Sequence, residues 1–155
     1  MFRLAKYKDI EEISRLRIMQ QKDDWKELYP NNDEELYTLT KKYLEEHLNK
    51  NVFFFIEIED NKIVATCGLQ VIRYMPQCVE SGIEGYICDV FTLKEYRKRG
   101  IQTNLIKECI KFAKENNIIE LKLSSDNPEA IRIYQAQGFE HDKLIMKKQL
   151  YYKQE

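Results

Sequence analysis

Apolar residues in the first third of the chain recur every three or four positions, the spacing of one buried helix face. We expect a short strand over 2–6, then a helix with Asp9 as its N-cap, and a second helix over 34–49. Pro30 and the polar residues after it separate the two helices. The apolar stripes are Ile10, Ile13 and Leu16 in the first helix and Leu36, Leu39, Tyr43, Leu44 and Leu48 in the second.

The middle of the chain is rich in β-branched and aromatic residues, in stretches too short for typical helices. Residues 52–59 and 62–74 are separated only by the two-residue turn Asp60-Asn61, so they predict a β-hairpin. Residues 83–93 predict a further strand. Three strands therefore follow one another without an intervening helix.

Helical spacing returns after Gly100, and the predicted stripe is Ile101, Leu105, Cys109, Phe112 and Ala113. A short strand over 118–123 follows. The next helix begins at Pro128 and ends before Gly138, and residues 139–150 predict a last strand. The order β-α-α-β-β-β-α-β-α-β is an α+β (mixed α/β) layout, a central mixed sheet flanked by helices. We expect one domain over residues 1–155.

Composition narrows the class of protein. The chain has 155 residues, 43% hydrophobic and 33% charged, with a net charge of −1, which is typical of a soluble globular protein. Near-zero charge argues against a nucleic-acid partner or an anionic membrane surface. No apolar run approaches the ~20 residues of a membrane span, and the acidic start lacks a signal peptide's apolar stretch. We expect a cytoplasmic protein.

Cysteine and histidine positions give no metal-binding pattern. Cys67, Cys78, Cys88 and Cys109 form no Cys-x-x-Cys pair, and the only histidines, His47 and His141, are far from ligand spacing. We therefore expect no metal, and thiols that lie in the core of a protein in a reducing compartment.

A run from Val90 to Thr103 carries the most informative chemistry. A predicted strand leads into the basic turn Arg97-Lys98-Arg99, and Gly100 opens a helix. The unpaired N–H groups and positive dipole of a helix N-terminus suit a phosphate, and glycine allows its close approach. An ordinary basic turn before a helix is the alternative reading. The usual mononucleotide and dinucleotide loops are absent from the sequence.

Two motifs resemble the GNAT superfamily of N-acetyltransferases. Arg97-x-x-Gly100-x-Gln102 is similar to the family's Arg/Gln-x-x-Gly-x-Gly/Ala turn, and the segment from Asn127 through Ala130 and Tyr134 to Gly138-Phe139 resembles its Asn-x-x-Ala-x-x-x-Tyr-x-x-x-Gly-Phe segment. The opening strand and helix resemble the family's start, so the resemblance covers nearly the whole chain. Gln102 departs from the pattern, since the family prefers a small residue there. Its side chain would either crowd a pyrophosphate or point into solvent.

The resemblance implies acetyl-coenzyme A as the cosubstrate. Backbone groups of Val90, Phe91 and Thr92 would pair with the pantetheine arm as an extra strand would. The pyrophosphate would lie on the amides from 98 to 103, and Asn127 would bond the arm near the second strand–helix junction. The implied coenzyme-binding residues are Val90, Phe91, Thr92, Arg97, Lys98, Arg99, Gly100, Ile101, Gln102, Thr103 and Asn127.

The resemblance also implies direct attack of an amine on the thioester, with Tyr134 as general acid. A tyrosine pKa of about 10 lies near a thiol's 8.5, so proton donation to a departing thiolate is nearly balanced. Glu84 and Asp89 are the candidate bases. They have opposite parity along the strand and face opposite ways unless a bulge intervenes. We favour Glu84, and a solvated carboxylate at a strand end is the alternative for it.

The acceptor amine is less constrained. Residues 23–35 carry a local charge of −5 close to Trp25, Tyr29 and Tyr37, which would attract a cationic amine. The alternative is that this acidic run is only a solvated helix end. The loop over 73–82 is a second candidate wall of the acceptor site. The acidic residues are Asp23, Asp24, Glu27, Asp33, Glu34 and Glu35.

We expect an N-acetyltransferase that acts on the primary amine of a small molecule. A non-catalytic acyl-coenzyme A-binding regulatory module and a protein or peptide N-acetyltransferase are the alternatives. An exposed sheet edge, or the Tyr151-Tyr152 pair, would offer a surface for a homodimer.

Overall fold

A five-stranded mixed sheet forms the centre of the protein in a computed structural model that describes residues 1–78 and 81–150. Two compact units make up the chain, Met1–Ser124 and Ser125–Glu155. The predicted dimer contact through Tyr151-Tyr152 lies outside the described residues. The elements are β1 (Phe2–Leu4), α1 (Ile10–Trp25), α2 (Asp33–His47), β2 (Val52–Glu59), β3 (Lys62–Arg73), β4 (Ile83–Thr92), α3 (Ile101–Glu115) and β5 (Glu120–Lys122) in the first unit, and α4 (Pro128–Ala136) in the second.

The strands follow the order β1-β2-β3-β4-β5, and the pairs β1–β2, β2–β3 and β3–β4 are antiparallel. β5 runs parallel to β4, as expected where a helix connects two strands. The predicted hairpin is confirmed. Asp60 and Asn61 both have positive φ, 49° and 59°, which is the geometry that suits a two-residue hairpin turn. The predicted mixed α+β fold with a central sheet is likewise confirmed.

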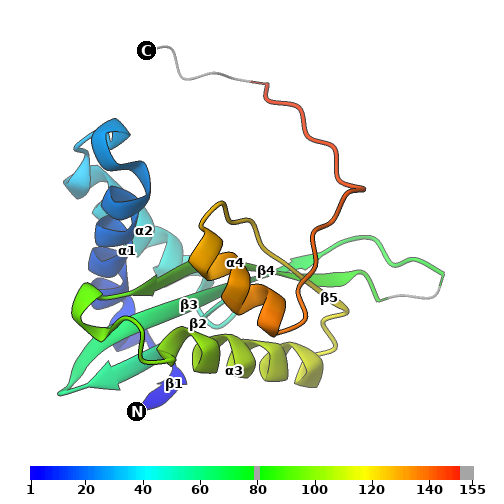
Figure 1. The fold of residues 1–155 in the computed structure, drawn as a ribbon, viewed down its shortest axis with the longest axis horizontal. Helices are drawn as coiled ribbons and strands as arrows, with labels where there is room; N and C mark the ends of the chain where they lie inside the picture. The colour runs from blue at the N-terminus through cyan, green and yellow to red at the C-terminus, as the bar shows by residue number, and fades with distance from the viewer. Residues whose placement is uncertain (79–80, 151–155) are drawn as a thin grey trace. The chain divides into compact units, whose positions relative to one another are not determined.

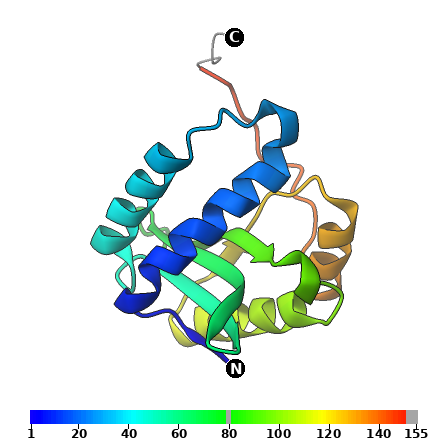
Figure 2. The same cartoon turned by 90° about the vertical axis from the view of Figure 1, so that its left-hand side faces the viewer.

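Helices cover both faces of the sheet in the first unit. Alternation along β2 sends Phe54 and Ile56 into a core shared with α1 and α2, while Phe53 and Phe55 pack on Phe112 of α3. The ring centroids of Phe53 and Phe112 are 4.7 Å apart. Figure 2 shows α1 lying across one face with α2 beside it, and Figure 1 shows α3 along the sheet. The buried face of α3 contains Leu105, Cys109 and Ala113 of the predicted stripe and also Ile106, which the stripe did not include, while Ile101 and Phe112 are only partly buried.

The predicted stripe of α2 is only partly right. Leu44 and Leu48 are buried, but the side chains of Leu39 and Tyr43 are exposed. Thr40, a polar residue, takes the buried position one turn before Leu44. Residues four apart share a helix face, so once Leu44 is buried, Thr40 is too, and Leu39 turns outward.

The prediction that Asp9 is the N-cap of α1 is confirmed, but its side chain makes no capping hydrogen bond. Asp9 occupies the N-cap position, but its carboxylate accepts two hydrogen bonds from Arg3, at 2.7 and 2.9 Å, and one from the Lys6 N–H at 2.7 Å. The bond from Arg3 lowers the pKa of the Asp9 carboxyl. Asp9 therefore ties β1 to the start of α1 instead of satisfying the first amides of the helix.

The predicted strand over residues 139–150 is also wrong, because the structure has no strand there. Leu144, Ile145 and Met146 follow one another directly and are exposed. Three consecutive apolar residues beside lysines lack the period-two alternation of a half-buried strand, and this segment pairs with no neighbouring strand.

Candidate functional site

The N-terminus of α3 is open to a ligand. Gly100 is the N-cap with φ 74°, no side chain caps the helix, and its first turn holds no acidic residue. The Asn104 N–H donates to the Gly100 carbonyl at 3.2 Å, so the N–H groups of residues 101–103 have no intrahelical acceptor. A Cβ on Gly100 would meet nothing within 4 Å. The left-handed backbone thus favours glycine, and the space beside it is clear.

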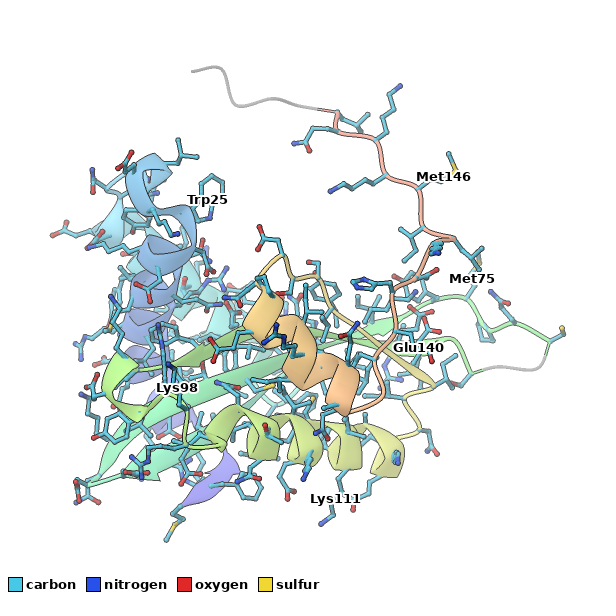
Figure 3. All side chains as sticks on the ribbon, viewed as in Figure 1. Trp25, Met75, Lys98, Lys111, Glu140 and Met146 are labelled. Carbon is cyan, nitrogen blue, oxygen red and sulfur yellow. The ribbon has the colours of Figure 1, made fainter. Side chains whose placement is uncertain are left out.

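The three basic residues of the turn are not equivalent. Arg97 pairs with Asp23 at 2.8 Å and donates from Nε to the Thr92 carbonyl at 2.9 Å. Arg99 forms a two-pronged pair with Glu59, at 2.8 and 3.1 Å. Lys98 is exposed on the turn (Figure 3) and has no ion-pair partner among the residues the structure describes. The positive charge at this turn that is not already paired therefore belongs to Lys98.

The acidic segment over 23–35 is partly neutralised within the protein. Asp23 meets Arg97 and lies 3.7 Å from the Lys94 ammonium, so the end of α1 is tied to the turn before α3. Asp33 pairs with Lys22 at 2.6 Å and accepts from the Tyr29 hydroxyl at 3.0 Å. These contacts reduce the negative charge that the segment would present to an acceptor amine.

Trp25, by contrast, remains half-exposed at the end of α1 (Figure 3). In the other candidate wall of the acceptor site, the loop over 73–82, the side chains of Tyr74 and Met75 are exposed as well. The structure thus leaves the aromatic part of the predicted acceptor surface accessible, while much of its charge is paired.

Gln102 contradicts both expectations for its side chain. Its Nε2 donates to the Phe91 carbonyl at 2.7 Å, the Thr92 hydroxyl at 2.8 Å and the Thr66 carbonyl at 3.1 Å. The side chain therefore turns back into the sheet, so it neither points into solvent nor covers the N-terminus of α3. The sequence could not reveal this, because the acceptors lie on two strands.

Beyond its first residues, β4 has a strand neighbour on one side only. β5 pairs with β4 through Glu84, Gly85 and Tyr86, and the described residues offer no strand partner farther along that edge. Val90, Phe91 and Thr92 lie in this unpaired stretch. The Phe91 and Thr92 carbonyls already accept bonds from Gln102 and Arg97. The pairing of these residues with a pantetheine arm stays a prediction.

A bulge interrupts the pairing of β3 and β4. The register passes from Thr66 opposite Phe91 to Gly68 opposite Cys88, so Cys67 faces both Asp89 and Val90. Asp89 has φ 49°, in the left-handed region that is uncommon for residues other than glycine.

The bulge brings the two candidate bases onto the same face. Gly68, Cys88 and Phe54 are neighbours on the face that carries α1, and Glu84 shares that face with Cys88 by alternation. The Asp89 side chain also points there, since it accepts a hydrogen bond from Arg17 of α1.

The surroundings of the two carboxylates differ. Burial raises the pKa of Asp89, and the nearby Arg17 charge opposes that shift. Glu84 pairs with Lys122 at 2.8 Å, and Lys122 also lies 3.2 Å from Glu120. Glu84 and Glu120 together raise the pKa of the Lys122 ammonium. Local sequence patterns do not identify Arg17 or Lys122 as partners of these carboxylates, since they are 72 and 38 residues away from them.

Asn127 and Tyr134 belong to the second unit. The Asn127 Oδ1 accepts from the N–H groups of Glu129 and Ala130, at 3.0 and 3.2 Å, so this side chain is the N-cap of α4. The Tyr134 ring lies edge-on to Phe139, with centroids 6.0 Å apart. The coenzyme contact of Asn127 and the acid role of Tyr134 stay predictions.

The four cysteines are free thiols. Cys67 and Cys109 are buried and Cys88 is half-buried, but Cys78 is exposed, so the prediction of core thiols fails for Cys78. Among the described residues no group of His, Cys, Asp and Glu could hold a metal ion. None of the helices in the described part of the chain combines the length and apolar character that a membrane span needs.

Comparison with known proteins identifies the family. The family model for the acetyltransferase (GNAT) family matches residues 18–139, so the chain belongs to this family of acyl-coenzyme A-dependent N-acyltransferases. An N-alpha-acetyltransferase of Saccharolobus solfataricus is 29% identical over 110 residues, and the match spans 64% of each chain.

Solved structures agree with this assignment. A predicted acetyltransferase from Clostridium acetobutylicum, solved with acetyl-CoA, is 27% identical, with a TM-score of 0.81 over 97% of this chain and 96% of that one. A possible acetyltransferase from Clostridium difficile shares the fold, with a TM-score of 0.77, 19% identity and 98% of each chain covered.

Proposed function

We propose that this protein transfers the acetyl group of acetyl-coenzyme A to the primary amine of a small molecule. The observation that carries the coenzyme assignment is the uncapped N-terminus of α3 beside Lys98, a turn with open space and no acidic residue in the first helical turn. An anion such as a pyrophosphate fits there. The Clostridium acetobutylicum relative, whose structure holds acetyl-CoA, supports the same ligand.

In this proposal the chain holds the coenzyme at two places. The amides of residues 98–103, the Lys98 ammonium and the Thr103 hydroxyl bind the pyrophosphate, and the unpaired edge of β4 over 90–92 lies along the pantetheine arm. Asn127 bonds the arm through its amide N–H groups, since its Oδ1 caps α4. Arg97 and Arg99 contribute to coenzyme binding by stabilising the turn, because their own charges are paired with Asp23 and Glu59.

Tyr134 acts as general acid and Glu84 as general base in the proposed reaction. The amine nitrogen bonds to the thioester carbonyl carbon, the carbon–sulfur bond breaks, and Tyr134 donates a proton to the departing sulfur. Glu84 accepts the proton that the amine loses, directly or through water. This help matters because a free alkylamine with a pKa near 10.4 costs about 4–5 kcal/mol to deprotonate at pH 7.

Asp89 competes with Glu84 for the base role, because its pKa is raised and the bulge turns it to the same face. A pH profile of kcat/KM separates the two carboxylates. Loss of the acidic limb in Glu84→Gln, with the limb retained in Asp89→Asn, supports Glu84. Loss of that limb in Asp89→Asn instead would move the base to the bulge.

A second acceptor class has support of its own. The relative from Saccharolobus solfataricus is described as an N-alpha-acetyltransferase, which favours the α-amine of a polypeptide as the competing acceptor. The exposed aromatic side chains of Trp25 and Tyr74, which belong to two separate candidate walls, are each compatible with either acceptor, since both acceptors present a cationic amine next to apolar groups.

Release of coenzyme A from acetyl-coenzyme A, measured across a panel of acceptors, tests the proposal. The panel contains diamines, free amino acids, peptides with a free α-amine and N-blocked peptides that contain lysine. Because Cys78 is an exposed free thiol that would contribute to a thiol-release signal, the assay uses Cys78→Ser as its background. Turnover with free amines alone supports the proposal, and turnover with α-amino peptides alone would replace it with the second acceptor class.

Tyr134→Phe separates catalysis from binding. We expect kcat to fall roughly 100-fold, the scale of one general acid, while the Kd for acetyl-coenzyme A stays within about twofold. A non-catalytic acyl-coenzyme A-binding module would bind the coenzyme in both forms and turn over no amine. Gln102 gives no support to that module, because its side chain lies against the sheet and leaves the anion site open.

A further inference from the structure

The Gln102 amide is the polar link between the first turn of α3 and two strands of the sheet. Its Nε2 lies within 3.1 Å of the Thr66 carbonyl on β3 and of the Phe91 carbonyl and Thr92 hydroxyl on β4. Two of these three acceptors are carbonyl oxygens, which cannot donate, so the NH2 end of the amide must face them. The Gln102 Oε1 is buried without a partner among the described residues.

The acceptors cluster at the bulge of β4. Thr66 and Phe91 are the last matched pair before the register shifts, so their carbonyls lie at the edge of the bulge. The Thr66 hydroxyl donates to the Asp89 carbonyl at 2.9 Å, and the Gln102 amide serves the Thr66 and Phe91 carbonyls. These side-chain hydrogen bonds join the two strands beside the bulge and stabilise its observed shape.

We propose that Gln102 is a positioning residue that locks the anion-binding turn of α3 to the bulged segment of β4. This inference rests on the proposed function, in which one ligand spans both places. The N-terminus of α3 would bind the pyrophosphate, and residues 90–92 would lie along the arm. A ligand that spans two sites binds most tightly when their separation is fixed beforehand, since binding then does not have to order them.

The surroundings of position 102 favour glutamine over other residues of similar size. A methionine fills similar space without a donor, and a glutamate would place negative charge against three oxygen atoms. A small residue leaves the first turn of α3 without a link to the bulge. The Oε1 is left without a partner in the described part of the chain because the NH2 end of the amide, with its two hydrogens, is turned toward these acceptors.

Binding of two ligands tests the lock. Acetyl-coenzyme A spans both places, whereas 3′-phosphoadenosine 5′-diphosphate reaches only the turn. For Gln102→Met we expect roughly tenfold weaker acetyl-coenzyme A binding, the equivalent of one lost hydrogen bond, and less than about threefold change for the fragment. Gln102→Ala gives a second variant of smaller volume with the same expected direction. Lys107→Met is the matched control, because Lys107 is exposed on the same helix.

Unchanged acetyl-coenzyme A affinity in both Gln102 variants would overturn the inference. So would equal losses for the two ligands, because these would indicate general damage to the turn. A general structural role would not change the ratio of the two affinities.

Amide hydrogen exchange in the unliganded protein tests the same lock without any coenzyme. We expect Gln102→Met to speed exchange in residues 90–92 and 101–104 and to leave β2 unchanged. Unaltered exchange in those segments would also overturn the inference. If the parent protein binds no acetyl-coenzyme A, the proposed function fails, and the exchange measurement still decides whether Gln102 locks the turn to the bulge.

Discussion

Lys98→Met is expected to weaken acetyl-coenzyme A binding roughly 5- to 30-fold, which corresponds to about 1 to 2 kcal/mol. Lys98 is exposed, so its attraction to a phosphate charge about 4 Å away is near the 1 kcal/mol expected in water, and a pyrophosphate carries more than one charge. Its ammonium has no ion-pair partner among the described residues, so the whole charge is available to a ligand.

The matched control removes a neighbouring charge pair instead. Arg99 is bonded to Glu59 at 2.8 and 3.1 Å, so the double variant Glu59→Gln with Arg99→Met leaves the local net charge unchanged. We expect less than about threefold change in the Kd of this double variant. The Kd of Arg99→Met alone should lie between those of Lys98→Met and the double variant, because this substitution leaves the Glu59 carboxylate unpaired near the incoming phosphates.

Isothermal titration calorimetry at two salt concentrations measures these differences. The Debye length falls from about 10 Å at 0.1 M to about 3 Å at 1 M salt, so the gap between the parent protein and Lys98→Met should shrink as salt rises. The reasoning is refuted if Lys98→Met binds like the parent at low salt while the double variant loses most of its affinity. That outcome would assign the phosphate contact to the paired arginine.

Two further predictions concern stability. Gly85→Ala should lower the free energy of unfolding by about 1 to 2 kcal/mol in a denaturant titration, because its Cβ would come within 2.7 Å of Leu121 and 2.8 Å of Leu69; no loss would mean that the leucines move aside. Asp9→Asn should cost about 2 kcal/mol at neutral pH through the lost bonds from Arg3. Because the pKa of Asp9 is lowered in the fold, its stabilisation is present above the ordinary carboxyl pKa near 4 and is lost as pH falls below it, so parent and variant should converge in acid. A gap between them that is independent of pH would contradict the ion-pair explanation.

Local patterns predicted the elements that depend on local chemistry. The turn residues Asp60 and Asn61 adopt the positive φ that a tight hairpin needs, and the buried face of α3 follows its apolar spacing. The predicted strand over 139–150 is wrong because strand formation depends on more than local chemistry. A strand is defined by its pairing with a neighbour, and short apolar runs beside Lys143 and Lys147 do not specify one.

Contacts between distant segments account for most of what the sequence did not reveal at the site. Arg97 and Arg99 looked alike in a basic turn, yet their carboxylate partners are 74 and 40 residues away. Sequence motifs do predict the turn and its glycine. Which of its charges remain available is decided by residues outside the motif, Asp23 and Glu59.

The bulge in β4 is a backbone feature that the sequence pattern also did not predict. Parity along β4 alone placed Glu84 and Asp89 on opposite faces, and one extra residue brought both to the face of α1. The orientation of Gln102 depends on contacts beside that bulge, because two of its acceptors are the carbonyls of Thr66 and Phe91, the last matched pair before the register shift. Periodicity in the sequence carries no information about a single inserted residue.

Calorimetric titration of acetyl-coenzyme A into the parent protein, Gly100→Ala and Gly100→Glu tests the central claim most directly. Space beside Gly100 is clear, so alanine should bind with a modest loss that reflects about 1–2 kcal/mol of backbone strain at φ 74°. Glutamate places a carboxylate at the anion site and should abolish binding while the variant remains folded. Absence of binding by the folded parent protein would contradict the account, and so would equal binding by Gly100→Glu.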